Sequence, residues 1–156
     1  MGIPRAPQPA KENDILTNPG NRSTRYAEGL RVFKEVVGDS ADRTISRIEE
    51  TSPDVAHHLI AFGFGDIYAR PGLAPKQRQL VTLGMLTALG GCEAELHFHI
   101  KASLRVGVTP EEILEVFLQS AVYCGFPKVL NALAEATKIF ASQGIQPSNR
   151  EEEAEP

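Results

Sequence analysis

A thiol, a carboxylate and an imidazole recur at helical spacing in the middle of the chain. Cys92, Glu95 and His99 follow the glycine pair 90–91 and lie at positions i, i+3 and i+7. Side chains with these spacings share one face of an α-helix. A carboxylate one turn before an imidazole can orient the ring and tune its pKa for proton transfer. We therefore predict Glu95 and His99 to be a catalytic pair; the alternative is a surface helical pair that adds roughly 0.2–0.5 kcal/mol of stability.

Three further polar side chains are candidates for contact with a substrate. Arg78 lies on the apolar segment that precedes the glycine pair. A guanidinium that faces inward is costly unless it meets an anion, so Arg78 either binds an anion or points outward to solvent. Tyr123 and Asn131 flank the turn at 125–127. Both either line a pocket or serve as structural polar groups.

Residues of metal-ligating types are present, but their spacing does not suit a metal ion. Cys92, Glu95, His97 and His99 could all act as ligands by type. On a helix the two histidines point about 200° apart and cannot share an ion. Neither a His-Glu-x-x-His nor a His-x-x-Glu-His motif occurs. We predict no metal site, and we count His97 and Cys92, with Tyr123 and Asn131, as candidate substrate-binding residues.

The two cysteines leave a redox interpretation open. A Cys-x-x-Cys centre that starts at Cys92 would need a second thiol at position 95, where Glu95 stands. Cys92 and Cys124 could still meet in space. The other interpretation of each is a small packed residue.

Length, charge and composition limit the function classes. The chain has 156 residues, so one domain is expected. Its formal net charge of −4 argues against nucleic acid as a partner. No apolar run approaches the roughly 20 residues that a membrane span needs. The N-terminus lacks the apolar region of a secretory signal, and two cysteines fit a reducing compartment, so a cytoplasmic location is predicted.

Apolar spacing and capping signals predict an all-α domain of about six to seven helices. No segment alternates with period two over a useful length, so no strand is expected. The clearest local signal is Thr109-Pro110-Glu111-Glu112, a capping box with proline at the first helical position. The predicted helices span about 24–37, 40–48, 53–69, 74–90, 92–105, 110–123 and 127–143.

The expected organisation is one helical domain between two irregular ends. Residues 1–22 are rich in proline and are expected to form a flexible arm. Residues 23–144 form the domain, and 145–156 form an acidic, disordered tail that contains three consecutive glutamates. The last helix of the domain is expected to pack through Leu130, Leu133, Ala134, Thr137 and Phe140.

Several short motifs together resemble the γ-carboxymuconolactone decarboxylase family. The likeness covers roughly residues 25–142, and its joint pattern is specific although each piece is weak. It also extends upstream to Gly29-Leu30 and to residues 35–38. The motifs are Arg70-Pro71-Gly72-Leu73, residues 78–86, Ala88-Leu89-Gly90, Glu95-Leu96, His99, Gly107-Val108-Thr109, Glu111-Glu112, and residues 123–127 through Asn131-Ala132-Leu133.

This resemblance implies a fold, an assembly and a reaction. The fold is the helical bundle of alkyl hydroperoxide reductase D-like proteins, assembled as a homohexamer, a trimer of dimers. The reaction is the cofactor-free decarboxylation of 4-carboxymuconolactone, or a closely related lactone acid, to an enol-lactone in protocatechuate (β-ketoadipate) catabolism. The substrate is a small anionic lactone. Arg78 is expected to bind its carboxylates, and His99 held by Glu95 is expected to deliver a proton to carbon.

The same superfamily offers alternatives. Proteins of the alkyl hydroperoxide reductase D type carry Cys-x-x-Cys-x-x-x-His, and here Glu95 replaces the second thiol between Cys92 and His99. A two-cysteine peroxidase or disulfide reductase is therefore disfavoured but remains the second interpretation. A member acting on another enolisable lactone or keto acid, and a non-catalytic member of the fold, are the other two.

Overall fold

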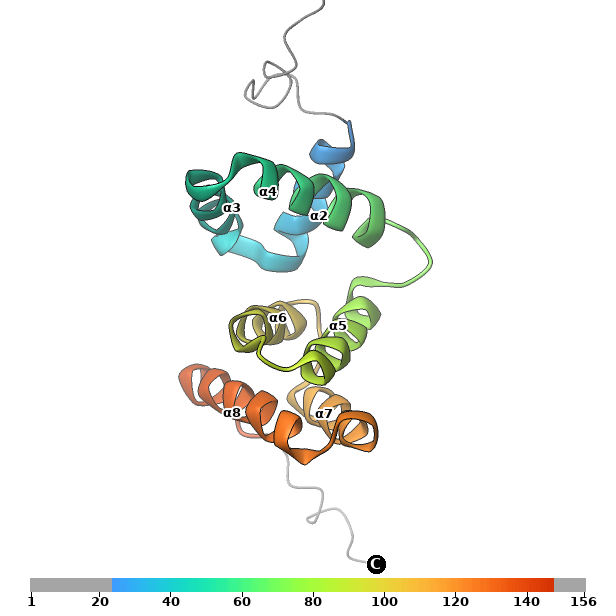
Figure 1. The fold of residues 1–156 in the computed structure, drawn as a ribbon, viewed down its shortest axis with the longest axis vertical. Helices are drawn as coiled ribbons and strands as arrows, with labels where there is room; N and C mark the ends of the chain where they lie inside the picture. Colours follow the sequence, from blue (N-terminus) through green and yellow to red (C-terminus); the bar gives the residue numbers. More distant parts are fainter. Residues whose placement is uncertain (1–23, 148–156) are drawn as a thin grey trace, which may run out of the picture. The chain divides into compact units, whose positions relative to one another are not determined.

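The structure is a computed structural model, and it describes residues 24–147. Every regular element in that range is a helix, so the predicted all-α domain is confirmed (Figure 1). The predictions for the arm at 1–22 and for most of the tail at 145–156 lie outside the described residues. None of the described helices combines the length and the apolar character needed to cross a lipid bilayer. Backbone contacts divide the helices into two compact units, 24–35 with 39–70, and 36–38 with 71–147.

The first unit contains most of α2 (Thr24–Val37) and of the 3₁₀ turn η2 (Gly38–Ser40), and all of α3 (Ala41–Thr51), α4 (Pro53–His58) and the π-helix η3 (Leu59–Tyr68). Ser52 caps α4, since its side chain accepts a hydrogen bond from the Val55 N–H at 3.3 Å.

The segment predicted as one α-helix over 53–69 is helical throughout, but its second part is a π-helix. There the Ala69 N–H bonds to the Phe64 carbonyl five residues back, at 2.9 Å. The sequence prediction was right about the extent of this segment and wrong about its geometry after His58. Apolar spacing over ten residues does not separate the i+4 from the i+5 pattern, so tertiary packing decides between them.

Helix α2 and the π-helix η3 approach each other backbone to backbone. A Cβ atom at Gly29 would lie 2.0 Å from the carbonyl oxygen of Ile60, and one at Gly65 would lie 2.2 Å from that of Arg25. Real side chains do not reach such distances, so both positions need glycine for steric reasons. The Phe33 and Phe64 rings, 4.7 Å apart in an edge contact, extend the same interface.

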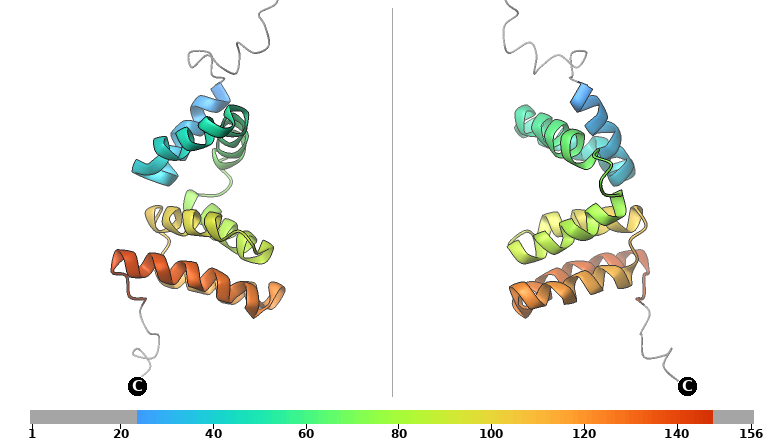
Figure 2. Two further views of the ribbon diagram at one scale, coloured as in Figure 1. Left: turned by 60° about the vertical axis from the view of Figure 1, so that its left-hand side comes forward. Right: turned by 90° about the vertical axis from the view of Figure 1, so that its right-hand side faces the viewer.

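The second unit is a bundle of four helices, α5 (Pro75–Leu89), α6 (Glu93–Arg105), α7 (Pro110–Cys124) and α8 (Phe126–Gln143). Helix α5 packs against α6 and α7, and α8 packs against the same two helices. The views in Figure 2 show α5 and α6 in one layer and α7 and α8 in the other. Each helix therefore presents one side to the common core and another away from it.

Capping residues fix where the helices of this bundle begin and end. Thr109 and Glu112 exchange the two hydrogen bonds of the predicted capping box, at 2.8 and 3.2 Å. Gly90 and Gly125 end α5 and α7 with φ of 69° and 78°, a region that favours glycine. Lys128 of α8 reaches the C-terminus of α5 and donates to the carbonyls at 88 and 89.

The sequence-based choice of the core face of α8 was wrong. Leu130 is 58% exposed and Leu133 38% exposed, and Ala134 and Thr137 are also exposed; only Phe140 of the predicted set is buried. Helix α8 carries apolar residues on two faces, and periodicity alone does not tell which face meets the core. The buried residues of α8 are Val129, Ala132, Glu135, Ala136, Ile139 and Phe140.

We expect Gly65→Ala to destabilise the protein. The added methyl group would overlap the Arg25 carbonyl, and relief of such overpacking costs about 1–3 kcal/mol. Gly63→Ala on the same π-helix is the matched control, because its Cβ would lie 3.9 Å from the nearest atom, Leu59 Cδ1, in ordinary contact. Urea unfolding of both variants measures the difference. Equal midpoints for the two variants would contradict the close backbone approach.

Candidate functional site

The predicted catalytic histidine meets a buried glutamine on the neighbouring helix. His99 Nδ1 of α6 lies 3.0 Å from Gln79 Oε1 of α5, and the Gln79 side chain is fully buried. The Ser103 hydroxyl, one turn further along α6, donates to the His99 carbonyl at 2.7 Å. The ring is thus held by a contact between two packed helices, and not by a contact within its own helix.

Burial controls the charge state of this imidazole. Removal from water lowers the pKa of His99 from its usual 6.5 to about 4, and the negative charge of Glu95 opposes this shift only in part. Glu95 itself is exposed on the first turn of α6. At neutral pH the ring is therefore uncharged. Glu95 acts on it through charge, while Gln79 provides its hydrogen bond.

The amide nitrogen of Gln79 is an unusual feature of the bundle. This Nε2 atom is buried and makes no hydrogen bond with any residue of the described chain. An unsatisfied buried donor of this kind costs about 1–3 kcal/mol. Such costs are found where a ligand oxygen completes the hydrogen bonding.

Arg78 precedes Gln79 on α5 and is half-buried. Its Nε atom is shielded from solvent, which fits the interpretation that it faces inward better than the outward one. Neighbouring positions on a helix diverge by about 100°, so Arg78 and Gln79 present their groups on adjacent faces of α5. A guanidinium and an amide are therefore carried by consecutive residues in the first part of this helix.

The cysteines lie at helix ends. Cys92 is the residue before α6, and its Sγ contacts the Gly90 carbonyl at 3.5 Å. Cys124 ends α7, and its Sγ contacts the Gly125 carbonyl at 3.9 Å. Both thiols are free and half-buried, so no disulfide bond links Cys92 to Cys124.

His97 faces a different neighbour from His99. Its Nδ1 lies 3.4 Å from an oxygen of Glu135 on α8, and Lys138 binds the other oxygen of that carboxylate. The hydrogen bond from Lys138 is the main cause that lowers the pKa of Glu135. The two histidines of α6 thus point toward different helices, as their spacing predicts. No group of three metal-ligating side chains suited to one ion occurs within residues 24–147.

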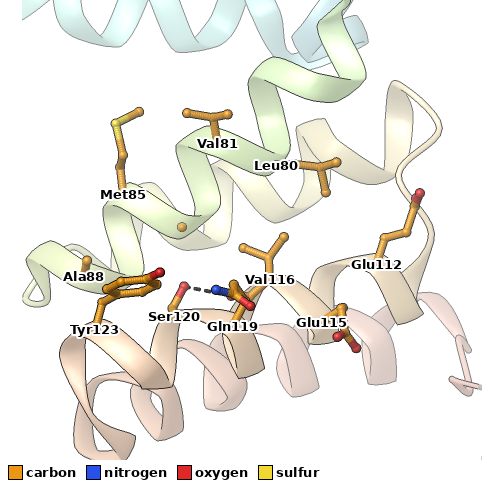
Figure 3. Close-up of a pocket in the computed structure, with 11 residues that line it drawn as sticks. Leu80, Val81, Met85, Ala88, Glu112, Glu115, Val116, Gln119, Ser120 and Tyr123 are labelled. Atoms are coloured by element: carbon orange, nitrogen blue, oxygen red, sulfur yellow. Dashed lines mark hydrogen bonds between the residues drawn. The ribbon is translucent and has the colours of Figure 1, made fainter.

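An apolar groove between α5 and α7 is a separate feature (Figure 3). It has a volume of about 720 Å³, and His99 and Arg78 are not among its lining residues. Tyr123, 81% exposed, lines one end, while Glu112 and Glu115 lie at the other. Carboxylates and an apolar wall do not suit a dianion, so we place the substrate elsewhere. The full lining is Leu80, Val81, Gly84, Met85, Ala88, Glu112, Glu115, Val116, Gln119, Ser120 and Tyr123.

The structure brings only some of the predicted site residues onto neighbouring helices. Arg78 and His99 lie on the paired helices α5 and α6, and Glu95 lies one turn before His99. Tyr123 lines the groove, and Asn131 is exposed on α8. The candidate residue that sequence reasoning missed is Gln79. Its one signal was its place between Arg78 and the apolar run that begins at Leu80.

Comparison with known proteins agrees with these features. The model of the carboxymuconolactone decarboxylase family matches residues 53–138. The chain is 35% identical, over 128 residues, to the 4-carboxymuconolactone decarboxylase of Acinetobacter baylyi, which covers 81% of this chain and 95% of that protein.

Two further relatives cover most of the same range. One is the nitrosuccinic acid decarboxylase npaB of Metarhizium robertsii, 35% identical over 118 residues, or 74% of this chain and 80% of that protein. The other is an uncharacterized 15.0 kDa protein of Paracoccus denitrificans, 30% identical over 97 residues, or 62% of this chain and 72% of that protein. With its all-α fold and these matches, the chain belongs to the carboxymuconolactone decarboxylase family and is an enzyme of that type.

Proposed function

We propose that the protein decarboxylates a small dianionic acid whose own structure takes up the electrons of the broken bond, with 4-carboxymuconolactone as the first candidate. The carrying observation is a buried, neutral His99 anchored by Gln79, with Arg78 on the same helix as Gln79. Both relatives with a named activity are decarboxylases. In such a substrate the electron sink is internal, so the chemistry needs neither a metal nor pyridoxal.

Two groups support binding of an anion beside His99. Arg78 offers a guanidinium whose Nε is shielded from water, and charge-assisted bonds to carboxylates are strongest where water is excluded. Gln79 Nε2 offers buried N–H donors. A substrate carboxylate or lactone oxygen would accept from Gln79 Nε2 and remove the cost of leaving that donor unsatisfied.

The arriving substrate would change the charge of His99. In the free protein burial outweighs the effect of Glu95, so the ring is neutral. A substrate carboxylate close to the ring favours the imidazolium, because opposite charges stabilise one another in a site of low dielectric constant. His99 would therefore take up one proton as the substrate binds. This proton is the one that the reaction needs later.

The bond changes then balance. As the bond between ring carbon and carboxylate breaks, its electron pair moves through the ring double bond into the lactone carbonyl, and carbon dioxide leaves. The resulting dienolate takes the proton from His99 onto carbon, and the imidazole returns to its neutral form. One proton is consumed for each carbon dioxide released. Arg78 and Gln79 would stabilise the oxyanion that develops in between.

The Metarhizium relative suggests a second candidate substrate with the same electronic logic. In nitrosuccinate a nitro group sits on the carbon that bears the leaving carboxylate, so it can accept the electron pair as a nitronate. Nitrosuccinate is also a dianion, and it has only four carbon atoms. Neither the sequence nor the fold distinguishes between the two acids as substrates, so the shape of the site must discriminate between them.

We also propose that the chain associates with copies of itself, in line with the predicted homohexamer. Besides Leu130 and Leu133, the second unit exposes Val122 (74%), Tyr123 (81%) and Phe126 (64%). Apolar side chains gathered at the end of α7 and along one face of α8 need cover. A second copy is the natural occupant, because the same patch on two subunits can pair around a twofold axis.

We expect the purified protein to release carbon dioxide from 4-carboxymuconolactone, from nitrosuccinate, or from both. His99→Gln should lower kcat by about 10²–10⁴-fold, because the proton donor is lost. Arg78→Gln should mainly raise KM. Cys124→Ser serves as the control with unchanged turnover. Peroxide consumption with a dithiol donor, abolished in Cys92→Ser, would instead support the peroxidase alternative.

The stability of the protein should fall as the pH drops from 6.5 to 4. In this window the unfolded chain binds a proton on His99, while the folded chain, with a pKa of about 4, does not. The upper limit of this loss is on the order of 3 kcal/mol. Denaturant unfolding at several pH values should show a weaker dependence for His99→Gln. An NMR titration midpoint for His99 near 6.5 would contradict this expectation.

Leu130→Glu should reduce the size of the assembly. A charge on the exposed apolar face of α8 would have to be buried between subunits, at a cost of several kcal/mol. Thr137→Glu, also exposed on α8 but already polar, is a milder comparison. Light scattering after size exclusion gives the mass. A monomeric wild-type protein at micromolar concentration would refute the self-association.

A further inference from the structure

We propose that Gln79 is the positioning residue of His99: its buried amide oxygen holds the Nδ1–H of the ring, so that Nε2 is the nitrogen that takes up and releases the proton. This inference rests on the proposed function and adds a residue to it. Gln79 has no ionisable group and belongs to α5, whereas His99 belongs to α6. Its role is to orient the His99 ring and to select which ring nitrogen carries the hydrogen; Gln79 does not react itself.

The geometry of the contact selects the nitrogen. Gln79 Oε1 faces His99 Nδ1 at 3.0 Å. A carbonyl oxygen can only accept a hydrogen bond, so Nδ1 must carry the hydrogen. In the neutral ring Nε2 is then unprotonated, and in the imidazolium the same bond to Gln79 persists. The contact therefore serves both charge states, and only Nε2 changes between them.

Burial strengthens the preference for the ring form with hydrogen on Nδ1. The Gln79 side chain is fully buried, so water does not compete for its oxygen. Ser103, which is also fully buried, bonds the His99 carbonyl from the next turn of α6. The Gln79 bond thereby holds the ring across two packed helices, while the Ser103 bond holds the backbone of the same residue. A proton carried on Nε2 has a defined direction with respect to Gln79.

The absence of charge on Gln79 matters as much as its position. A carboxylate at this place would favour the imidazolium in the free protein, whereas an amide leaves the ring neutral until an anion arrives. The charged groups of the neighbouring helices lie elsewhere. On α6 Glu95 acts on the ring from one turn away; on α8 Glu135 contacts His97, and Lys138 contacts Glu135.

The remaining charged groups also leave the ring without a close counter-ion. The α7 carboxylates Glu112 and Glu115 line the groove, whose walls do not include His99. Arg78 of α5 is the cation next to Gln79 along that helix. Substrate carboxylates would therefore be the groups that switch the ring to its cationic form.

Gln79→Glu tests this assignment without reliance on activity. The variant is isosteric but ionisable. If the introduced carboxyl group is charged, it favours the imidazolium and moves the titration midpoint of the ring upward from about 4 by about 1–3 pH units, while Nδ1 keeps its hydrogen. If that carboxyl group is protonated, it donates to Nδ1 and transfers the ring hydrogen to Nε2. In the wild type, by contrast, Nε2 carries no hydrogen at neutral pH and the midpoint is about 4.

Nitrogen-15 NMR of the ring distinguishes these states, because protonated and unprotonated ring nitrogens resonate in separate regions. Gln77→Glu is the matched control: the same change two residues away on α5, at an exposed position where the side chain already accepts a hydrogen bond from Ala74. It should leave the His99 signals unchanged. A wild-type ring with hydrogen on Nε2 at neutral pH would overturn the proposal, and so would the same ring signals together with the same titration midpoint in Gln79→Glu and the wild type.

Kinetics of a second variant separate positioning from a structural role. Gln79→Met keeps the volume but removes the acceptor, and we expect kcat to fall by about 10–100-fold with little change in KM, while circular dichroism shows the native helix content. Unchanged kcat would refute the role of Gln79. If the wild type decarboxylates neither acid but shows the expected NMR signals, the positioning of His99 stands and the proposed function fails.

Discussion

The hydrogen bond between His99 and Gln79 joins the two helices that carry the candidate chemistry. It forms only where α5 and α6 pack closely enough to bury a polar pair. A polar pair inside a bundle is stable when its members satisfy one another, and costly when either is left alone. The His99 ring meets this condition through Gln79, while the second amide atom of Gln79 does not. This imbalance between a satisfied imidazole and an unsatisfied amide is the feature on which the proposed ligand contact at Gln79 rests.

The same helices explain why burial, and not the nearby acid, sets the state of His99. Glu95 lies on the exposed side of α6, where water screens its charge. The lowered pKa of His99 follows from loss of solvent, which outweighs the attraction of the carboxylate. A neutral imidazole in the resting protein is useful for a reaction that begins with an anion, because the substrate supplies the counter-ion and the proton arrives with it.

The apolar residues of the bundle divide between an inner and an outer set. The inner set forms the core shared by α5, α6, α7 and α8. The outer set, on α7 and α8, includes side chains as exposed as Val122 and Phe126. A small four-helix bundle cannot bury all of its apolar surface internally. The groove between α5 and α7 belongs to this outer surface, which separates it from the anion chemistry around His99.

Helix positions and caps were predictable from the sequence because they depend on neighbours along the chain. The capping box at Thr109, the proline start at Pro53 and the end at Gly90 all follow from local hydrogen bonding and φ preferences. The family was recognisable for a related reason, since its motifs are defined by residue types at fixed spacings along the chain. The placement of Glu95 one turn before His99 was predictable as well, and so was the divergence of His97, but the hydrogen bond that holds the His99 ring is made with Gln79.

Tertiary structure alone decided three things. It chose Gln79 as the hydrogen-bond partner of His99, it turned the segment after His58 into a π-helix, and it selected the buried face of α8. The sequence determined which residues could meet on one helix and where each helix stops. It did not determine which faces of different helices meet, because that depends on contacts between residues far apart in the chain, and several faces of this protein are apolar enough to pack.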